Sequence, residues 1–192
     1  MTTPEPAGER TMRERMLAGE LYLADDPVLA EEQGRAARLL ERFNRTGVDD
    51  ADERRGLLLE LLGQFGEGSE IKAPLRCDYG YRIRIGARTF VNYGLVALDV
   101  ASITIGDDVQ VGPNVQLLTP THPVEPDARR AKWEAAEPIA IEANVWLGGG
   151  VIVLPGVTVG ENTVVGAGSI VTKDLPPNVV AAGNPARVVR ST

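Results

Sequence analysis

The sequence predicts a mainly β fold in which a β-solenoid of six-residue repeats follows a helical N-terminal segment. Branched aliphatic residues recur at every sixth position from residue 141 to 171, and a second column of mostly small or β-branched residues stands four positions after each of them. Aromatic residues make up only 5% of the chain while glycine occurs 21 times, which suits short flat strands joined by tight corners. The first column is Ile141, Leu147, Val153, Val159, Val165 and Val171, and the second is Val145, Val151, Val157, Thr163, Ser169 and Leu175.

A period of six fits neither a helix nor a simple alternating strand, and it is typical of a hexapeptide β-helix. Each repeat forms one short strand and a turn, three repeats complete a triangular coil, and stacked coils bury the aliphatic column. Two upstream stretches, 105–117 and 85–97, continue the pattern, and the earlier one is displaced by two residues. A β-sandwich with glycine-rich turns is the alternative, and the strict spacing argues against it.

Three helical signals lie in the N-terminal segment, residues 11–70. A capping box at Thr11 opens a first short helix. Asp26 is the N-cap of a second helix, because a proline at the first helical position follows it. A third helix follows Asp50 and carries an apolar face as far as Phe65. These short helices need a larger partner against which to pack.

The rest of the chain divides at the changes of pattern. Residues 1–10 are polar and rich in proline, which predicts a disordered tail. Residues 71–192 form the β-helix domain, which the prolines after Asp174 close with a C-terminal cap. The repeats break at 119–138, and such an excursion from a regular solenoid is often the functional part.

Composition excludes several classes of function. The net charge is −7 and no run of basic residues occurs, so nucleic acid is not an expected partner. The single cysteine, Cys77, excludes an internal disulfide and any paired-cysteine metal or redox motif. No apolar leader and no membrane-length apolar stretch occurs, so we expect a cytoplasmic protein without a membrane partner.

Several motifs resemble the hexapeptide-repeat acetyltransferases. The stretch NVWLGGGVIVLPGVTVGENTVVGAGSIVTKDLPPNVVAAGNPARVV is similar to the C-terminal half of that family. MLAGELYLADDPVL, RCDYGYRIRIG, FVNYG and the TPTHPV loop resemble the maltose and galactoside O-acetyltransferase branch, in colinear order over about residues 12–190. The resemblance implies a left-handed parallel β-helix, a homotrimer, and transfer of an acetyl group from acetyl-CoA to a sugar hydroxyl.

The resemblance places the general base on His122, which is the only histidine and lies in the excursion. Imidazole suits the role because a sugar hydroxyl attacks a thioester only with a base that titrates near neutral pH. Glu134 is the candidate to orient this base. Asn92, in FVNYG, matches the asparagine that stabilises the developing oxyanion, and an amide N–H can donate there without competing for a proton.

Acceptor binding is expected from carboxylates, since each can accept two hydroxyl hydrogen bonds. Asp78 and Asp99 align with acceptor-site positions, and Asp78 replaces a serine of the galactoside enzyme. Asp25 lies next to Ala24, the residue that strictly aligns with an acidic acceptor contact. The neighbouring Asp26 fits better as a helix N-cap.

For acetyl-CoA, the resemblance marks small residues, which let the pantetheine arm approach the backbone, and basic residues, which suit its phosphates. Trp146 is a candidate wall of the coenzyme channel, and Cys77 is interpreted as a core thiol rather than an acyl-enzyme nucleophile. No metal is expected. The remaining coenzyme candidates are Gly149, Ala167, Thr172, Lys173, Arg187 and Arg190.

Three alternatives to a sugar O-acetyltransferase stay open. One is a hexapeptide acyltransferase with a non-sugar acceptor such as an antibiotic or an amino acid, although such relatives have different N-terminal regions. Another is a trimeric carbonic anhydrase, which needs three histidines around one zinc ion and is disfavoured by a single histidine per chain. The last is a non-catalytic β-helix module, which the intact His122 and Asn92 argue against.

Overall fold

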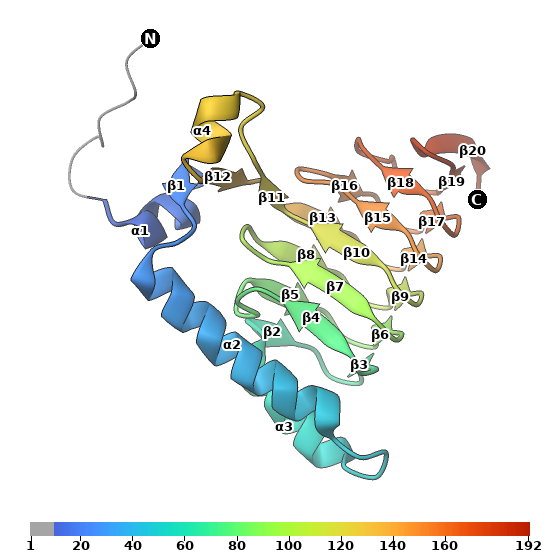
Figure 1. The fold of residues 1–192 in the computed structure, drawn as a ribbon. Coiled ribbons are helices and arrows are strands. Elements are labelled where there is room, and N and C mark those ends of the chain that lie inside the picture. Colours follow the sequence, from blue (N-terminus) through green and yellow to red (C-terminus); the bar gives the residue numbers. More distant parts are fainter. Residues whose placement is uncertain (1–9) are drawn as a thin grey trace.

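The computed structural model describes residues 10–192. Of the expected disordered tail, 1–10, all but Arg10 lies outside the described residues. The fold is mainly β, a parallel β-helix preceded by a helical segment (Figure 1), which confirms the predicted fold class. No helix within the described part is both long and apolar enough to span a bilayer. The helices are α1 (Met12–Leu17), α2 (Pro27–Arg45), α3 (Ala51–Leu61) and α4 (Pro126–Arg130).

The helix starts follow the local signals. Thr11 accepts a hydrogen bond from the backbone of Glu14 and Glu14 caps Thr11 in return, so the capping box opens α1 as expected. Asp26 caps α2 through hydrogen bonds from the backbone N–H groups of Val28 and Leu29. The apolar face of α2 is fully buried, and it consists of Leu29, Ala36, Leu39, Leu40 and Phe43.

The third helix is shorter than predicted, and the solenoid begins earlier. Helix α3 ends at Leu61, and Phe65 lies in a strand of the first coil rather than on the helix. The backbone turns extended at Leu62, and at Gly63 it packs so closely that a Cβ would lie 2.2 Å from the carbonyl oxygen of Tyr81. The coils therefore start at Gln64, and the predicted boundary at residue 71 is several residues too late.

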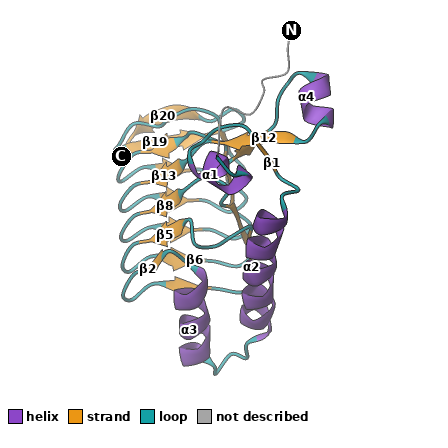
Figure 2. Ribbon diagram, turned by 90° about the vertical axis from the view of Figure 1, so that its left-hand side faces the viewer, coloured by secondary structure: helices purple, strands orange, loops and turns teal. Residues whose placement is uncertain are grey.

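Three sheets, parallel except for the last strand, β20, form the faces of a triangular prism, whose stacked coils Figure 2 shows from the side. Within the described residues the chain passes through the first, second and third face in turn, completes five coils and begins a sixth. The first face is β2 (Gln64–Phe65), β5 (Ile83–Ile85), β8 (Ile103–Ile105), β13 (Ile139–Ile141) and β16 (Thr158–Val159). The second face is β3 (Glu70–Ile71), β6 (Phe90–Val91), β9 (Gln110–Val111), β14 (Trp146–Leu147), β17 (Val164–Val165), β19 (Val179–Ala182) and β20 (Arg187–Ser191). The third face is β4 (Leu75–Cys77), β7 (Leu95–Leu98), β10 (Gln116–Leu118), β15 (Ile152–Val153) and β18 (Ile170–Val171).

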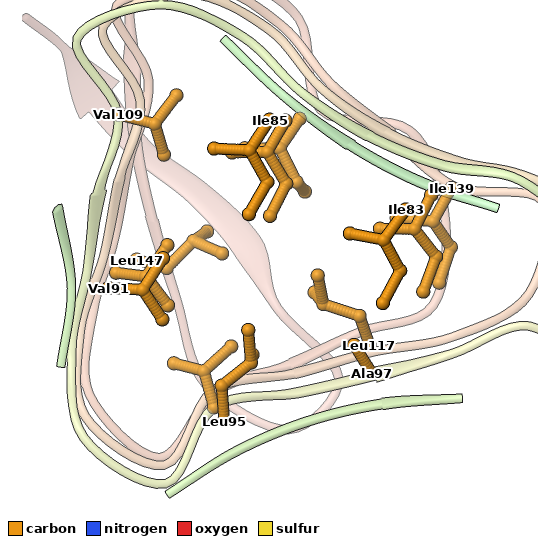
Figure 3. Packing of buried hydrophobic residues seen from close by; sticks show 14 of the residues in the cluster. Ile83, Ile85, Val91, Leu95, Ala97, Val109, Leu117, Ile139 and Leu147 are labelled. Atoms are coloured by element: carbon orange, nitrogen blue, oxygen red, sulfur yellow. The ribbon is translucent and has the colours of Figure 1, made fainter. Parts of the chain in front are cut away.

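The predicted aliphatic columns fill the interior of the prism. Seen along the axis, inward side chains stack on their equivalents in the next coil, as Ala97 does with Leu117, and the column continues through further coils, as from Ile83 to Ile139 two coils on (Figure 3). All six residues of the first column are at most 1% exposed, so the hexad pattern identified the core. Because each side chain packs on those directly above and below it, the register of every coil fixes that of its neighbours.

The excursion at 119–138 is an ordered unit tied to the N-terminal segment. It contains β11 (Pro120–Thr121), α4 and β12 (Trp133–Ala136). Strand β12 pairs antiparallel with β11 on one side and with β1 (Tyr22–Leu23) on the other. Figure 1 shows this three-stranded sheet and α4 together beyond one edge of the solenoid. The sequence pattern did not predict these elements, since the β1–β12 contact joins segments more than a hundred residues apart.

Both ends of the prism are closed. Helices α2 and α3 pack at the first coil, where α2 contacts β4 and α3 contacts β2 (Figure 1). At the other end, β20 turns back and pairs antiparallel with β19, which makes the predicted C-terminal cap a strand.

Candidate active site

An open hollow of about 470 Å³ lies beside the excursion, at the corner where the chain passes from the third face to the first. We call this the third–first corner. The hollow brings together His122 and Glu134 of the excursion and Asp25 of the N-terminal segment. Two of the predicted catalytic residues and one predicted acceptor residue are therefore neighbours here. The lining residues are Ala24, Asp25, His122, Arg129, Lys132 and Glu134.

His122 is exposed and follows directly on β11, whose pairing with β12 sets where the imidazole stands. The loop after it is held by Arg129, which donates hydrogen bonds to the carbonyl oxygens of Pro123 and Val124 at 3.0 and 2.9 Å. Arg129 is a contributor that sequence reasoning missed. In the sequence, only the position of Arg129 within the excursion at 119–138 could have pointed to it.

Glu134 does not hydrogen-bond His122 in this structure, contrary to its expected orienting role. Its Oε1 instead accepts a hydrogen bond of 2.8 Å from the hydroxyl of Tyr22, the residue directly opposite it on β1. Sequence reasoning missed Tyr22 as well, although it lies inside the AGELY segment on which the family resemblance was based.

Asp25 pairs with Lys132 across the hollow, with Nζ and Oδ2 2.8 Å apart. The hydrogen bond from Lys132 lowers the pKa of the Asp25 carboxyl. Both side chains are exposed, so the pair stabilises the fold little. Ala24 lines the same hollow, and Asp26 caps α2, as expected.

Asp78 lies half-buried at the third–first corner of the first coil. Burial raises the pKa of its carboxyl to about 6, and the charges of Asp99 and Glu134 add to the shift. Asp78 precedes Tyr79, which packs in one buried cluster with Tyr22, the hydrogen-bond partner of Glu134. Asp78 is therefore connected to the residue that borders the hollow through this cluster, and its acceptor role stays a prediction.

Asp99 has a different role from the one expected, because it is completely buried. Its carboxylate accepts hydrogen bonds from the backbone N–H groups of Asp78, Tyr79 and Arg82 at 2.9–3.3 Å. These bonds hold the longer corner between β4 and β5. The structure therefore assigns Asp99 to the fold rather than to acceptor binding.

Asn92 stands at another corner, where the chain passes from the second face to the third. We call this the second–third corner. The side-chain oxygen of Asn92 accepts a hydrogen bond of 2.8 Å from the backbone of Tyr93, which leaves its Nδ2 group as a donor. Asn92 is half-buried and faces no residue of the hollow, because the width of the third face separates them.

Gly149 and Ala167 lie on the same second–third corner as Asn92, two and three coils further along. Backbone hydrogen bonds of 2.8–2.9 Å stack successive turns, from Gly150 to Pro113 and from Gly168 to Gly149. This column of small residues leaves backbone accessible, as an extended pantetheine arm requires. Trp146 lies beside the column, on the outer surface of the second face, and is 56% exposed.

The basic coenzyme candidates do not cluster within one chain, contrary to expectation. Thr172 and Lys173 are exposed at the third–first corner, above the excursion. Arg187 and Arg190 lie on β20, where Arg187 pairs with Ala182 close to the second–third corner. One chain therefore presents Lys173 with His122, and Arg187 with Asn92.

The described site residues thus form two groups at opposite ends of the third face. The residues grouped with His122 come directly after the C-terminal ends of the third-face strands. The residues grouped with Asn92 come directly before the N-terminal ends of these strands. The four residues of β7 alone span roughly 10 Å at the usual rise of a strand. His122 and Asn92 of one chain therefore cannot act on one reacting atom.

Cys77 is half-buried at the end of β4 and packs against the core. Burial raises the pKa of its thiol, and the charges of Asp99 and Asp78 raise it further. A thiol that resists ionisation is a poor nucleophile, which supports its interpretation as a core thiol.

Comparison with known proteins gives matches over almost the whole chain. A family model described as the maltose acetyltransferase hexapeptide capping motif matches residues 15–66, and one described as bacterial transferase hexapeptide (six repeats) matches 138–173. The nodulation protein L of Rhizobium meliloti is 48% identical over 93% of this chain and 98% of its own length. The chain belongs to the hexapeptide-repeat acetyltransferases. Its helical segment carries the capping motif of this family, and its coils from β13 to β18 carry the hexapeptide repeats.

Solved structures of other hexapeptide-repeat acetyltransferases superpose closely. A maltose O-acetyltransferase from Clostridium difficile is 45% identical with a TM-score of 0.94, covering 95% of this chain and 97% of the other. A galactoside acetyltransferase in complex with coenzyme A is 41% identical with a TM-score of 0.91, covering 95% and 92%. The family resemblance drawn from the sequence motifs is confirmed.

Proposed function

We propose that this hexapeptide-repeat acetyltransferase transfers the acetyl group of acetyl-CoA to a hydroxyl of a sugar, with His122 as general base. The names of the similar solved structures support the reaction, since they include a maltose O-acetyltransferase and a galactoside acetyltransferase bound to coenzyme A. The hollow supports the acceptor, because carboxylates and an imidazole are groups that bind and deprotonate hydroxyls.

The reaction needs one proton to be moved twice. The imidazole of His122 takes the proton of the acceptor hydroxyl while the hydroxyl oxygen attacks the thioester carbonyl carbon. A C–O bond forms, and Nδ2 of Asn92 from a neighbouring chain donates a hydrogen bond to the oxyanion. The C–S bond then breaks, and the imidazolium returns the proton to the leaving thiolate, so the products are the O-acetyl sugar and coenzyme A.

We further propose that the working unit is a homotrimer with each site built from two chains. The observation that carries this proposal is the separation of the two groups of site residues at opposite ends of the third face. A head-to-tail contact would place the second–third corner of one chain against the third–first corner of the next, and three such contacts close a ring. Most outward side chains of the third face are apolar, which suits such a contact, and Arg76 and Gln116 are the polar exceptions; the apolar ones are Val96, Leu98, Leu118, Ile152 and Ile170.

The test is release of the coenzyme A thiol in the presence of acetyl-CoA and a panel of acceptors. The panel contains maltose, glucose, a galactoside, an amino acid and an antibiotic. Turnover that depends on a sugar supports the proposal, whereas turnover only with a non-sugar acceptor overturns its acceptor class. His122→Ala should lower turnover by about 10²–10⁴, the usual contribution of a positioned general base. Val124→Ala is the matched control, because Val124 lies in the same loop and is 92% exposed.

A further inference from the structure

The N-terminal segment reaches the candidate acceptor site through one buried hydrogen bond. Tyr22 is only 1% exposed and packs in a small cluster apart from the main core, against Met16, Leu29, Tyr79 and Val100. Its hydroxyl donates to Oε1 of Glu134 at 2.8 Å. Burial and this hydrogen bond raise the pKa of the Tyr22 phenol, so the group stays protonated and remains a donor at every physiological pH.

The backbone fixes the same pair of residues. Tyr22 and Glu134 are direct partners in the antiparallel pairing of β1 with β12, so their side chains emerge on the same side of the sheet. Arg15 lies over the ring of the neighbouring Trp133, with its guanidinium carbon 5.6 Å from the ring centroid. Helix α1 and strand β1 therefore hold β12 from two sides.

Glu134 keeps one carboxylate oxygen available. Among residues 10–192, Oε1 is engaged by Tyr22 and no hydrogen bond reaches Oε2. Glu134 also borders the hollow that contains His122. A carboxylate held at one oxygen presents the other in a fixed direction, which suits an acceptor hydroxyl that must be placed for deprotonation.

We propose that Glu134 binds a hydroxyl of the acceptor beside the one that is acetylated, and that Tyr22 is the positioning residue that holds Glu134 in place. This inference rests on the proposed function, because it assigns roles within the same acceptor site. It also gives the helical segment a direct part in the acceptor site, in addition to closing the end of the solenoid.

The experiment compares Tyr22→Phe with Tyr81→Phe in the full chain. Tyr81 is the matched control, since its hydroxyl donates a hydrogen bond of 2.7 Å to Glu32 in the same helical segment but lines no part of the hollow. With the best sugar of the panel as acceptor, Tyr22→Phe should raise the acceptor KM roughly tenfold, the value of a hydrogen bond to a charged group. The KM for acetyl-CoA should stay unchanged, and Tyr81→Phe should leave both constants at wild-type values.

A double-mutant cycle tests whether Tyr22 acts through Glu134. Glu134→Gln should raise the acceptor KM at least as much as Tyr22→Phe, and adding Tyr22→Phe to Glu134→Gln should cause little further change. Additive effects would overturn the positioning role. An unchanged acceptor KM with a lower kcat and a shifted pH profile in Glu134→Gln would overturn the binding role, because it would show that Glu134 acts on His122.

Melting temperatures keep the result interpretable. Tyr22→Phe and Tyr81→Phe each lose one hydroxyl from a Tyr–Glu hydrogen bond, so their thermal stabilities should fall by similar small amounts. Equal kinetic effects of the two variants would mean that Tyr22 supports only the fold. Failure of the proposed function looks different, since the wild-type enzyme would then acetylate no sugar of the panel.

Discussion

Asn92 and His122 lie at opposite ends of the third face, so one chain carries both groups without bringing them together. A corresponding separation holds for Arg187 and Lys173. If the enzyme closes into a ring of three, each reaction centre takes His122 from one chain and Asn92 from the next. This arrangement makes the activity of mixed assemblies predictable.

We predict that two inactive variants complement each other. His122→Ala and Asn92→Ala should each have very low turnover alone. When the two are co-expressed and purified together, a random mixture of chains restores both groups in about a quarter of the sites. Turnover should then recover to about a quarter of the wild-type value, as measured by thiol release.

Two comparisons qualify the complementation result. A mixture of wild type with His122→Ala should keep about half of the wild-type activity, since half of the sites receive a histidine. A mixture of the two variants that stays as inactive as each variant alone would contradict a site shared between chains.

Lys173→Ala should raise the apparent KM for acetyl-CoA while the acceptor KM stays nearly unchanged. Loss of one charge-assisted phosphate contact costs about 1–3 kcal/mol, which corresponds to roughly 5- to 150-fold. Arg187→Ala should behave alike. Arg84→Ala provides the control, because Arg84 is exposed on the first face, away from both groups. Equal changes in both KM values would assign Lys173 a structural role.

Asp78→Asn should stabilise the protein at neutral pH and not at acidic pH. Burial raises the folded pKa of Asp78 to about 6, above the usual unfolded value of about 4. The folded state therefore binds the proton more tightly, so this group's contribution to stability is fully present below about pH 4 and is lost as the pH rises through 6. The gain for Asp78→Asn at pH 7.5 should be at most about 2 kcal/mol, reduced by partial solvent exposure.

Urea denaturation at pH 7.5 and pH 4 measures this difference for wild type and for Asp78→Asn. A variant that is less stable than wild type at pH 7.5 would show that the Asp78 carboxylate has a stabilising partner. The same variant should also have an altered acceptor KM if Asp78 belongs to the acceptor site.

Asp99→Asn should destabilise the fold strongly. The amide group would turn an N–H donor toward backbone N–H groups that now donate to the carboxylate, at a cost of about 2–3 kcal/mol. Asp108→Asn serves as the comparison, since Asp108 is exposed and paired only with Arg88. If Asp99→Asn kept wild-type stability but lost acceptor binding, the expectation from the sequence would be right and the structural assignment wrong.

The sequence pattern predicted those features of the fold that depend on residues close together in the sequence. The hexads gave the buried columns, and the caps at Thr11 and Asp26 gave the starts of two helices. The pairing of Tyr22 with Glu134 has no local signal, because it depends on how the helical segment folds back against the excursion. Asp99 was misassigned because alignment with a family position carries no information about which way a carboxylate points.

The closed ends of the prism bear on how the protein avoids polymerising. A stack of parallel coils presents open strand edges at its top and bottom, and each edge could add another chain indefinitely. Side chains of helices α2 and α3 cover one of these edges. At the other end, β20 pairs antiparallel with β19, so the outermost strand no longer continues the parallel order of the coils. The lateral contact proposed for the third face closes on itself instead of extending, so it would give a particle of fixed size rather than a filament.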